Sequence, residues 1–178
     1  VKRAWRLANP HIAEFWDLVG TACLNAIENP GIEFPVRRGI VAKYDGQYLT
    51  VRLPAGRKLV YAKPRINDEQ SGSFTYLGID QKVRKWCRLE THGAKCVENL
   101  VQATSCDLLC GALVRLEKAG MCPVMHVHDE IVCEVPEVNG RKAYDLLAAV
   151  MTKPTSTVYR GLPLAVDGFV GNRYKKAD

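Results

Sequence analysis

Three consecutive ionisable residues, His128, Asp129 and Glu130, lie between two apolar runs rich in valine and isoleucine. This pattern over 124–135 predicts two buried strands joined by a tight turn. A carboxylate at such a turn is held by stiff backbone and still reaches open space. Magnesium suits this position, because it takes one or two carboxylates and completes its octahedron with water or substrate phosphate. Two such ions can activate an attacking hydroxyl and stabilise a leaving pyrophosphate, so Asp129 is the candidate metal ligand.

Two other interpretations of this segment stay open. Asp129 could simply favour the turn, since short acidic side chains stabilise turns. Alternatively, side chains at positions 126, 128 and 130 share one face of a regular strand. His126, His128 and Glu130 would then bind zinc, as in a metallohydrolase. The other two histidines, at positions 11 and 92, lie far away in the sequence.

The second candidate cluster is a cationic run around Trp86. Its cations are Lys82, Arg84, Lys85 and Arg88. Cations beside a nucleic-acid channel add salt-dependent affinity through counterion release. The same run could instead be a solvated strand with one anchoring tryptophan. Arg57 and Lys58 are weaker candidates of the same kind.

Composition narrows the class of protein. The chain has 178 residues, which allows one domain or a compact core with an appendage. Its net charge is 25 − 19 = +6, which favours an anionic partner, nucleic acid first. No apolar run approaches the roughly 18 residues of a membrane span. The seven cysteines are odd in number and include no Cys-x-x-Cys pair, which argues against a zinc finger or secreted disulfide framework. A reducing cytoplasm fits better.

Periodicity and turn residues predict the elements that must position these side chains. Asn9 and Pro10 begin a helix that ends at Asn29, and Asp45-Gly46 indicates a hairpin turn. The chain begins at a valine rather than a methionine, so we expect it to have been cut from a longer polypeptide or processed. The predicted order is a helix over 10–28, strands over 40–44, 48–53 and 58–62, a loop over 64–73, a strand over 74–79, a helix over 91–119, the hairpin, a helix over 138–151, and strand and coil over 161–178.

The predicted helix over 91–119 has an apolar stripe with polar residues at its edge. The stripe comprises Val97, Leu100, Val101, Thr104, Leu108 and Ala112. Glu98 and Gln102 are four residues apart, so they share a helical face at or beyond the edge of the stripe. A surface glutamine that is satisfied by water is the plain interpretation of Gln102.

Several of these segments, taken in order, resemble family A DNA polymerases, the bacterial polymerase I and phage type. The run 127–136 resembles the third polymerase motif of that family. Upstream, 91–103 with 107–109 resembles the long palm helix, 53–59 the short basic strand motif, and 4–16 the segment after the nucleotide-binding fingers helix; 161–164 and 171–174 resemble the closing strand. Order and spacing agree over nearly the whole chain.

This resemblance implies an α+β palm-type module, with an antiparallel sheet backed by helices and a hairpin-rich segment on the fingers side. Residues 1–80 would be the fingers-side segment and 81–178 the C-terminal palm segment. Asp129 would help to place two Mg²⁺ ions, with Glu130 as an auxiliary acid near them. His128 would contact the backbone or sugar at the primer terminus.

The resemblance also implies DNA contacts on the long helix. Gln102 would reach the minor groove near the primer end. Many members of the family have asparagine where this chain has Glu98, whereas Asn99 is one position off, so either residue could make that contact. Lys82, Arg84, Lys85 and Arg88 would bind DNA from their place just before the helix.

The implied reaction is nucleotidyl transfer from a deoxynucleoside triphosphate to a primer 3′-hydroxyl on primer–template DNA, in the cytoplasm of a bacterial or phage-infected cell and without a membrane partner. The family needs a second metal-binding aspartate and a nucleotide-gripping fingers helix, and neither pattern occurs here. We therefore expect the upstream part of the polymerase to be a partner and the isolated chain to be inactive. The rival functions are a non-catalytic nucleic-acid-binding module and the zinc metallohydrolase.

Overall fold

The computed structural model describes residues 2–153 and 159–174. It begins with two helices, α1 (Lys2–Ala8) and α2 (Pro10–Glu28). Pro10 lies in the first turn of α2, where its missing N–H leaves no hydrogen bond unmade. The start and end of α2 confirm the sequence prediction. The sequence analysis did not predict α1, in which Trp5 stacks on Trp16 of α2 with 5.3 Å between the ring centroids.

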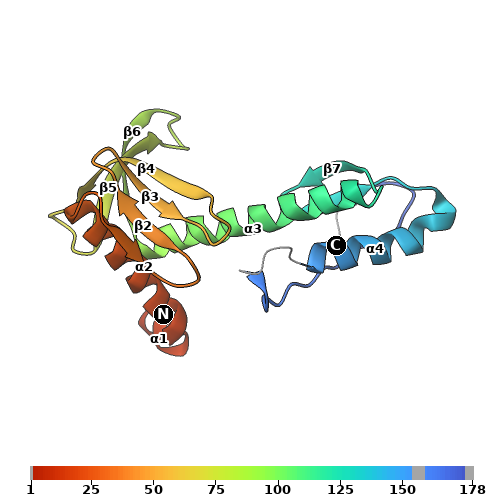
Figure 1. Cartoon of the computed structure of the whole chain (residues 1–178), viewed down its shortest axis with the longest axis horizontal. Coiled ribbons are helices and arrows are strands. Elements are labelled where there is room, and N and C mark those ends of the chain that lie inside the picture. The colour runs from red at the N-terminus through yellow and green to blue at the C-terminus, as the bar shows by residue number, and fades with distance from the viewer. Residues whose placement is uncertain (1, 154–158, 175–178) are drawn as a thin grey trace. The chain divides into compact units, whose positions relative to one another are not determined.

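A six-stranded antiparallel sheet follows, with its strands in sequence order (Figure 1). The strands are β1 (Glu33–Pro35), β2 (Val41–Tyr44), β3 (Tyr48–Arg52), β4 (Lys58–Ile66), β5 (Ser73–Ile79) and β6 (Trp86–His92). Gly46 adopts positive φ at the β2–β3 turn, and Gly56 does so at the β3–β4 turn. The predicted loop over 64–73 is too long, because β4 runs on to Ile66. The sequence analysis missed β1, and it considered β6 only as a solvated strand.

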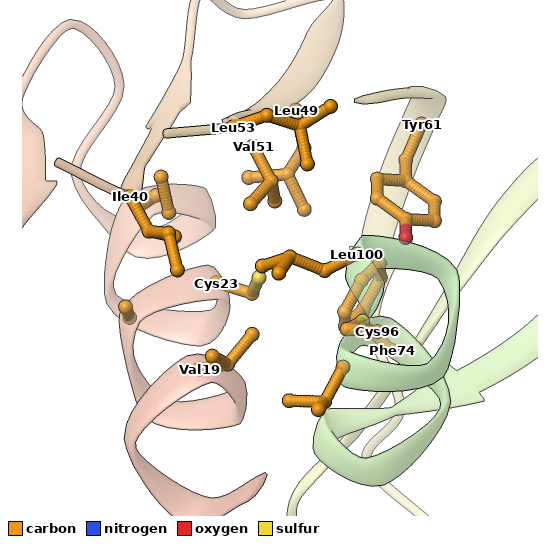
Figure 2. Close-up of a cluster of buried hydrophobic side chains, with 14 residues drawn as sticks. Val19, Cys23, Ile40, Leu49, Val51, Leu53, Tyr61, Phe74, Cys96 and Leu100 are labelled. Carbon is orange, nitrogen blue, oxygen red and sulfur yellow. The ribbon is translucent and has the colours of Figure 1, made fainter. Parts of the chain in front are cut away.

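The core of this region lies between α2, one face of the sheet and the first half of α3 (Gly93–Lys118). Figure 2 shows Val19 and Cys23 of α2 pointing toward the β3 side chains and toward Leu100 of α3. The pKa of Cys23 is raised well above its ordinary value by a hydrogen bond with Cys96 and by burial. Cys23 therefore stays a neutral thiol that packs as a small apolar group.

Glycine sets how closely α2 and α3 approach each other. A Cβ on Gly93 would clash with the backbone oxygen of Trp16, and one on Gly20 would lie 3.1 Å from the Gly93 Cα. On α3, Val97 and Leu100 are buried as predicted. Val101 is 52% exposed, so its place in the predicted stripe is wrong. The helix turns Val101 away from the core, which takes Cys96 instead.

The second half of α3 belongs to a separate, smaller core. It contains Ala112 and Leu116 of α3 together with Met121 and Ile131. A two-stranded sheet, β7 (Pro123–Val127) and β8 (Glu130–Cys133), precedes the 3-10 turn η1 (Glu137–Asn139) and α4 (Gly140–Thr152). The predicted strand in the tail is wrong for residues 159–174, which form turns and coil; positions 175–178 lie outside the described residues.

The structure therefore confirms the α+β class with an antiparallel sheet and helices. The chain divides into two compact units, which we call the sheet unit (Val1–Ala103) and the hairpin unit (Thr104–Asp178). This boundary lies inside α3. The sequence analysis divides the chain at 80/81 into a fingers-side and a palm segment. That division follows the family resemblance and not the compact units, so it stays a prediction. Among the described helices, none is both long and apolar enough to cross a membrane.

Candidate functional site

The candidate site is the turn that joins β7 to β8. The structure confirms the tight turn that the sequence predicts. Val127 pairs with Glu130, so His128 and Asp129 form the turn, and Glu130, which the sequence analysis places between the strands, begins β8. His128 has a φ of +52°, a left-handed conformation that few side chains other than glycine, asparagine, aspartate and histidine adopt readily. The strands are less buried than predicted, because every β7 side chain after Pro123 is exposed. Among the described residues this sheet has two strands, and Ile131 of β8 packs into the small core with Cys133 beside it.

Asp129 is exposed at the tip of this turn. None of the hydrogen bonds and ion pairs among the described residues involves its carboxylate. The aspartate at the β2–β3 turn differs: the Asp45 carboxylate accepts the backbone N–H groups of Gln47 and Tyr48 at 2.8 and 2.7 Å. An aspartate that served only to form its turn would make contacts of the Asp45 kind. The Asp129 carboxylate instead remains available to an external ligand.

Glu130 is oriented by a contact that the sequence analysis missed. The Tyr174 hydroxyl donates a hydrogen bond to Glu130 Oε2 at 2.7 Å. This hydrogen bond raises the pKa of Tyr174, because ionising the phenol would remove the donor and place two negative charges together. The sequence analysis assigns residues 171–174 only to a segment that resembles the closing strand. A distant tyrosine reaching an acid leaves no spacing signal in the sequence.

The zinc interpretation depends on a regular strand through residue 130, and this condition is not met. His126 lies in β7, whereas His128 lies in the turn and Glu130 begins the return strand. Among the described residues, no group of three His, Cys, Asp or Glu side chains is placed to hold a metal ion. The turn offers two neighbouring carboxylates, and these are the oxygen donors that magnesium accepts alongside water or phosphate.

The helix candidates lie in the sheet unit, on the first half of α3. Glu98 and Gln102 are both exposed, as their spacing predicts. Lys95 Nζ donates to both carboxylate oxygens of Glu98 at 2.9 Å. The Asn99 side chain is half-buried and donates to the Tyr61 hydroxyl at 3.2 Å. Asn99 therefore faces the core, and Glu98 presents the polar group to solvent.

The cationic run forms the β5–β6 turn and the start of β6. Lys82, Arg84 and Lys85 are exposed, and Asp80 Oδ1 fixes the turn by accepting the N–H groups of residues 82 and 83 at 2.8 and 3.0 Å. Arg88 Nη1 donates to the Lys63 carbonyl and to Thr75 Oγ1 at 3.2 and 3.1 Å. Trp86 is 63% exposed, so the interpretation of an anchoring tryptophan is wrong.

The two weaker cationic candidates, Arg57 and Lys58, differ in their contacts. The Arg57 guanidinium donates to the Ala103 carbonyl at 2.7 Å and so ties the turn after β3 to α3. That contact gives Arg57 a structural role. Lys58 is exposed at the start of β4.

Comparison with known proteins relates nearly the whole chain to one polymerase. Over 98% of its length, the chain is 45% identical to the DNA polymerase of Bacillus phage SP02, across 179 aligned positions. The aligned region covers 26% of that polymerase, so the chain spans about a quarter of the length of this curated relative. No protein-family model matches the sequence. No solved structure matches it.

Proposed function

We propose that this chain is the C-terminal palm portion of a DNA polymerase of the family A type. The observation that carries the proposal is the 45% identity, over almost the entire chain, to a phage DNA polymerase. The exposed aspartate at a two-residue turn supports it, because a metal ligand must be both fixed and accessible. The division into a fingers-side segment (1–80) and a palm segment (81–178) belongs to this proposal.

In this proposal Asp129 holds the catalytic Mg²⁺ ions together with a carboxylate from polypeptide outside this chain. The chemistry that two magnesium ions supply in such a site is activation of an attacking hydroxyl and stabilisation of a leaving pyrophosphate. Glu130 is the auxiliary acid, and Tyr174 fixes its orientation. His128, held at positive φ, contacts the primer terminus.

The substrates follow from the same assignment. They are primer–template DNA and a deoxynucleoside triphosphate, and the reaction is nucleotidyl transfer to the primer 3′-hydroxyl. Gln102 and Glu98 present polar groups from one exposed face of α3 to the minor groove. We assign this contact to Glu98 rather than Asn99, because the Glu98 side chain is exposed whereas the Asn99 side chain is half-buried against Tyr61. Lys82, Arg84, Lys85 and Arg88 bind the DNA backbone.

A chimera tests the proposal. This chain would replace the matching region of the phage SP02 polymerase, and the product would be assayed for primer extension with Mg²⁺ and all four deoxynucleoside triphosphates. We expect the chimera to extend primers and the isolated chain not to. Asp129→Asn should lower the rate of primer extension by more than about 100-fold. Loss of a residue that only supports a metal ligand costs less, about 10- to 100-fold.

His126→Ala is the matched control, since it alters the same hairpin at an exposed side chain. The polymerase proposal predicts little change for His126→Ala, whereas a zinc site built on that histidine would be lost. Normal synthesis by the Asp129→Asn chimera would refute the proposed role of Asp129.

A further inference from the structure

One face of the six-stranded sheet is free of the core. The register places Phe74, Tyr76 and their partners toward α2 and α3, and the alternate residues on the opposite face. We call this opposite face the open face. Its apolar members include Val60, Ile79 and Trp86, which are 57%, 62% and 63% exposed. Ile79 and Trp86 are directly paired at the end of the β5–β6 ladder.

Positive charge dominates the open face. By register, its cations are Lys43, Arg52, Lys58, Arg65 and Arg88, and its acids are Glu33 and Glu90. Glu33 is paired with Lys43 at 3.4 Å, and Glu90 accepts a hydrogen bond from the Asn67 amide at 3.3 Å. The remaining cations therefore face few competing carboxylates.

The β5–β6 turn extends this surface beside Trp86. Three of its six residues between the strands, Lys82, Arg84 and Lys85, are exposed cations, and Arg84 is held at a φ of +52°. The Asp80 carboxylate is occupied by the backbone of the turn, which fixes the loop. The exposed Trp86 thus follows directly after a turn that carries three exposed cations and is fixed by Asp80.

We propose that the open face binds single-stranded DNA, with a base stacked on Trp86 and phosphates bound by the cations around it. Exposed aromatic side chains on a positively charged sheet stack on bases, and bases are accessible only where the strand is unpaired. A duplex would present phosphates to the cations and leave Trp86 and Ile79 without partners. The preference for DNA rests on the proposed polymerase function, and an unpaired template strand is the corresponding substrate.

The test is binding of a fluorescein-labelled dT oligonucleotide of about 12 nucleotides to the 178-residue chain, within the footprint of known single-strand-binding folds. Trp86→Ala should weaken binding by about fivefold or more, and Trp86→Phe should restore part of the loss. Trp5→Ala is the matched control, because Trp5 is also exposed but lies in α1. An unlabelled duplex of the same length should compete poorly.

A pair of double variants tests the charge contribution. Lys82→Ala with Lys85→Ala should lower the slope of log affinity against log salt by about 1.4, since each lost phosphate contact on a single strand contributes about 0.7. Lys118→Ala with Lys142→Ala removes the same charge from exposed positions outside the sheet and should leave the slope unchanged. These substitutions are at exposed side chains, so circular dichroism should show the folded chain in every case.

Three outcomes would overturn the inference. They are absence of binding at low salt, binding that is indifferent to both Trp86→Ala and the Lys82/Lys85 pair, and self-association of the chain that depends on Trp86. The last would assign the open face to a protein partner. Primer extension by the chimera is a separate measurement that depends on Asp129, so failure of this inference is distinguishable from failure of the proposed polymerase function.

Discussion

The sheet unit and the hairpin unit bury their apolar side chains to different extents. In the sheet unit, α2 and α3 close one sheet face over a core that includes Leu49, Leu53 and Phe74. In the hairpin unit, Val124 and Val127 of β7 remain 60% and 38% exposed. The first unit buries its best apolar side chains within the described chain, whereas the second leaves part of a strand open. The sheet unit therefore has one face covered by helices and one open face, whereas the β7–β8 hairpin has little of its apolar surface covered by the described residues.

The aspartates at the two hairpin turns show the same contrast on a smaller scale. Asp45 uses its carboxylate to fix its own turn, and hydrogen bonds from Tyr48 and Gln47 lower its pKa. Asp129 keeps its carboxylate exposed, while the strain of the turn is taken by His128 at positive φ. An aspartate therefore stabilises the hairpin turn in the sheet unit, whereas the aspartate at the hairpin turn of the other unit leaves its carboxylate available to a ligand.

The largest effect on stability is expected at Gly93. In Gly93→Ala the new Cβ meets a backbone oxygen of α2, which cannot move without shifting the helix, so unfolding should become easier by about 3 kcal/mol. Gly140→Ala in the hairpin unit is the matched change, because among the described residues its Cβ meets a side chain, that of Val170 at 2.7 Å, and no backbone atom. It should cost less than about 1 kcal/mol. Urea unfolding of both variants measures the difference, and equal losses would contradict it.

A valine pair sharpens the comparison between the units. Val51→Thr places a hydroxyl in the core of the sheet unit, where the wild-type side chain is 2% exposed, and should cost about 1–3 kcal/mol. Val124→Thr makes the same change on exposed β7 and should lie within about 0.5 kcal/mol of the parent. Thermal melts of the two variants measure the two losses of stability. A strongly destabilised Val124→Thr chain would show that β7 is buried.

The sequence predicted the elements better than their burial. The turn residues Asp45-Gly46 and Asn9-Pro10 act locally, so the hairpin and the start of α2 follow from the chain alone. Burial depends on which elements meet in space. The apolar character of Val101 and of β7 predicts that both are buried, and the structure shows both exposed.

For the candidate site, too, the sequence predicts local features but not contacts between distant residues. The position of the turn and the exposure of Asp129 follow from the alternation of valines around three polar residues. The contact of Tyr174 with Glu130 and that of Asn99 with Tyr61 each join residues more than 35 positions apart. No local pattern encodes such pairs, so only the fold reveals that Asn99 is engaged and that Glu130 has a partner.

Removing the carboxylate of Asp45 should have a moderate effect. Asp45→Ala loses two hydrogen bonds at the β2–β3 turn and should lower the Tm by a few degrees. Because the folded pKa of Asp45 is depressed, its contribution is present above the ordinary pKa of aspartate, about 3.9, and is lost as the pH falls through the depressed value. The difference in Tm between parent and variant should therefore shrink in acid. A difference that is constant with pH would contradict this explanation.

The smallest effect is expected at Tyr174. Tyr174→Phe removes one exposed hydrogen bond and should leave the Tm nearly unchanged. The pKa of Tyr174 is raised, so its contribution is present below the ordinary tyrosine pKa of about 10 and is lost as the pH rises through the raised value. Glu130→Gln should bring the Tyr174 pKa back toward that ordinary value, as followed by NMR of the labelled ring. An unchanged titration would show that the two side chains do not interact in solution.

The most direct test of the central claim measures both hairpin aspartates in the same chimeric polymerase. Primer extension and thermal stability would be compared for Asp129→Asn and Asp45→Asn. The proposed function predicts that Asp129→Asn melts like the parent and loses more than about 100-fold in synthesis rate. It predicts that Asp45→Asn melts earlier and still extends primers below its melting temperature. Synthesis at the parental rate by the Asp129→Asn chimera would contradict the claim that this turn presents a metal-binding carboxylate.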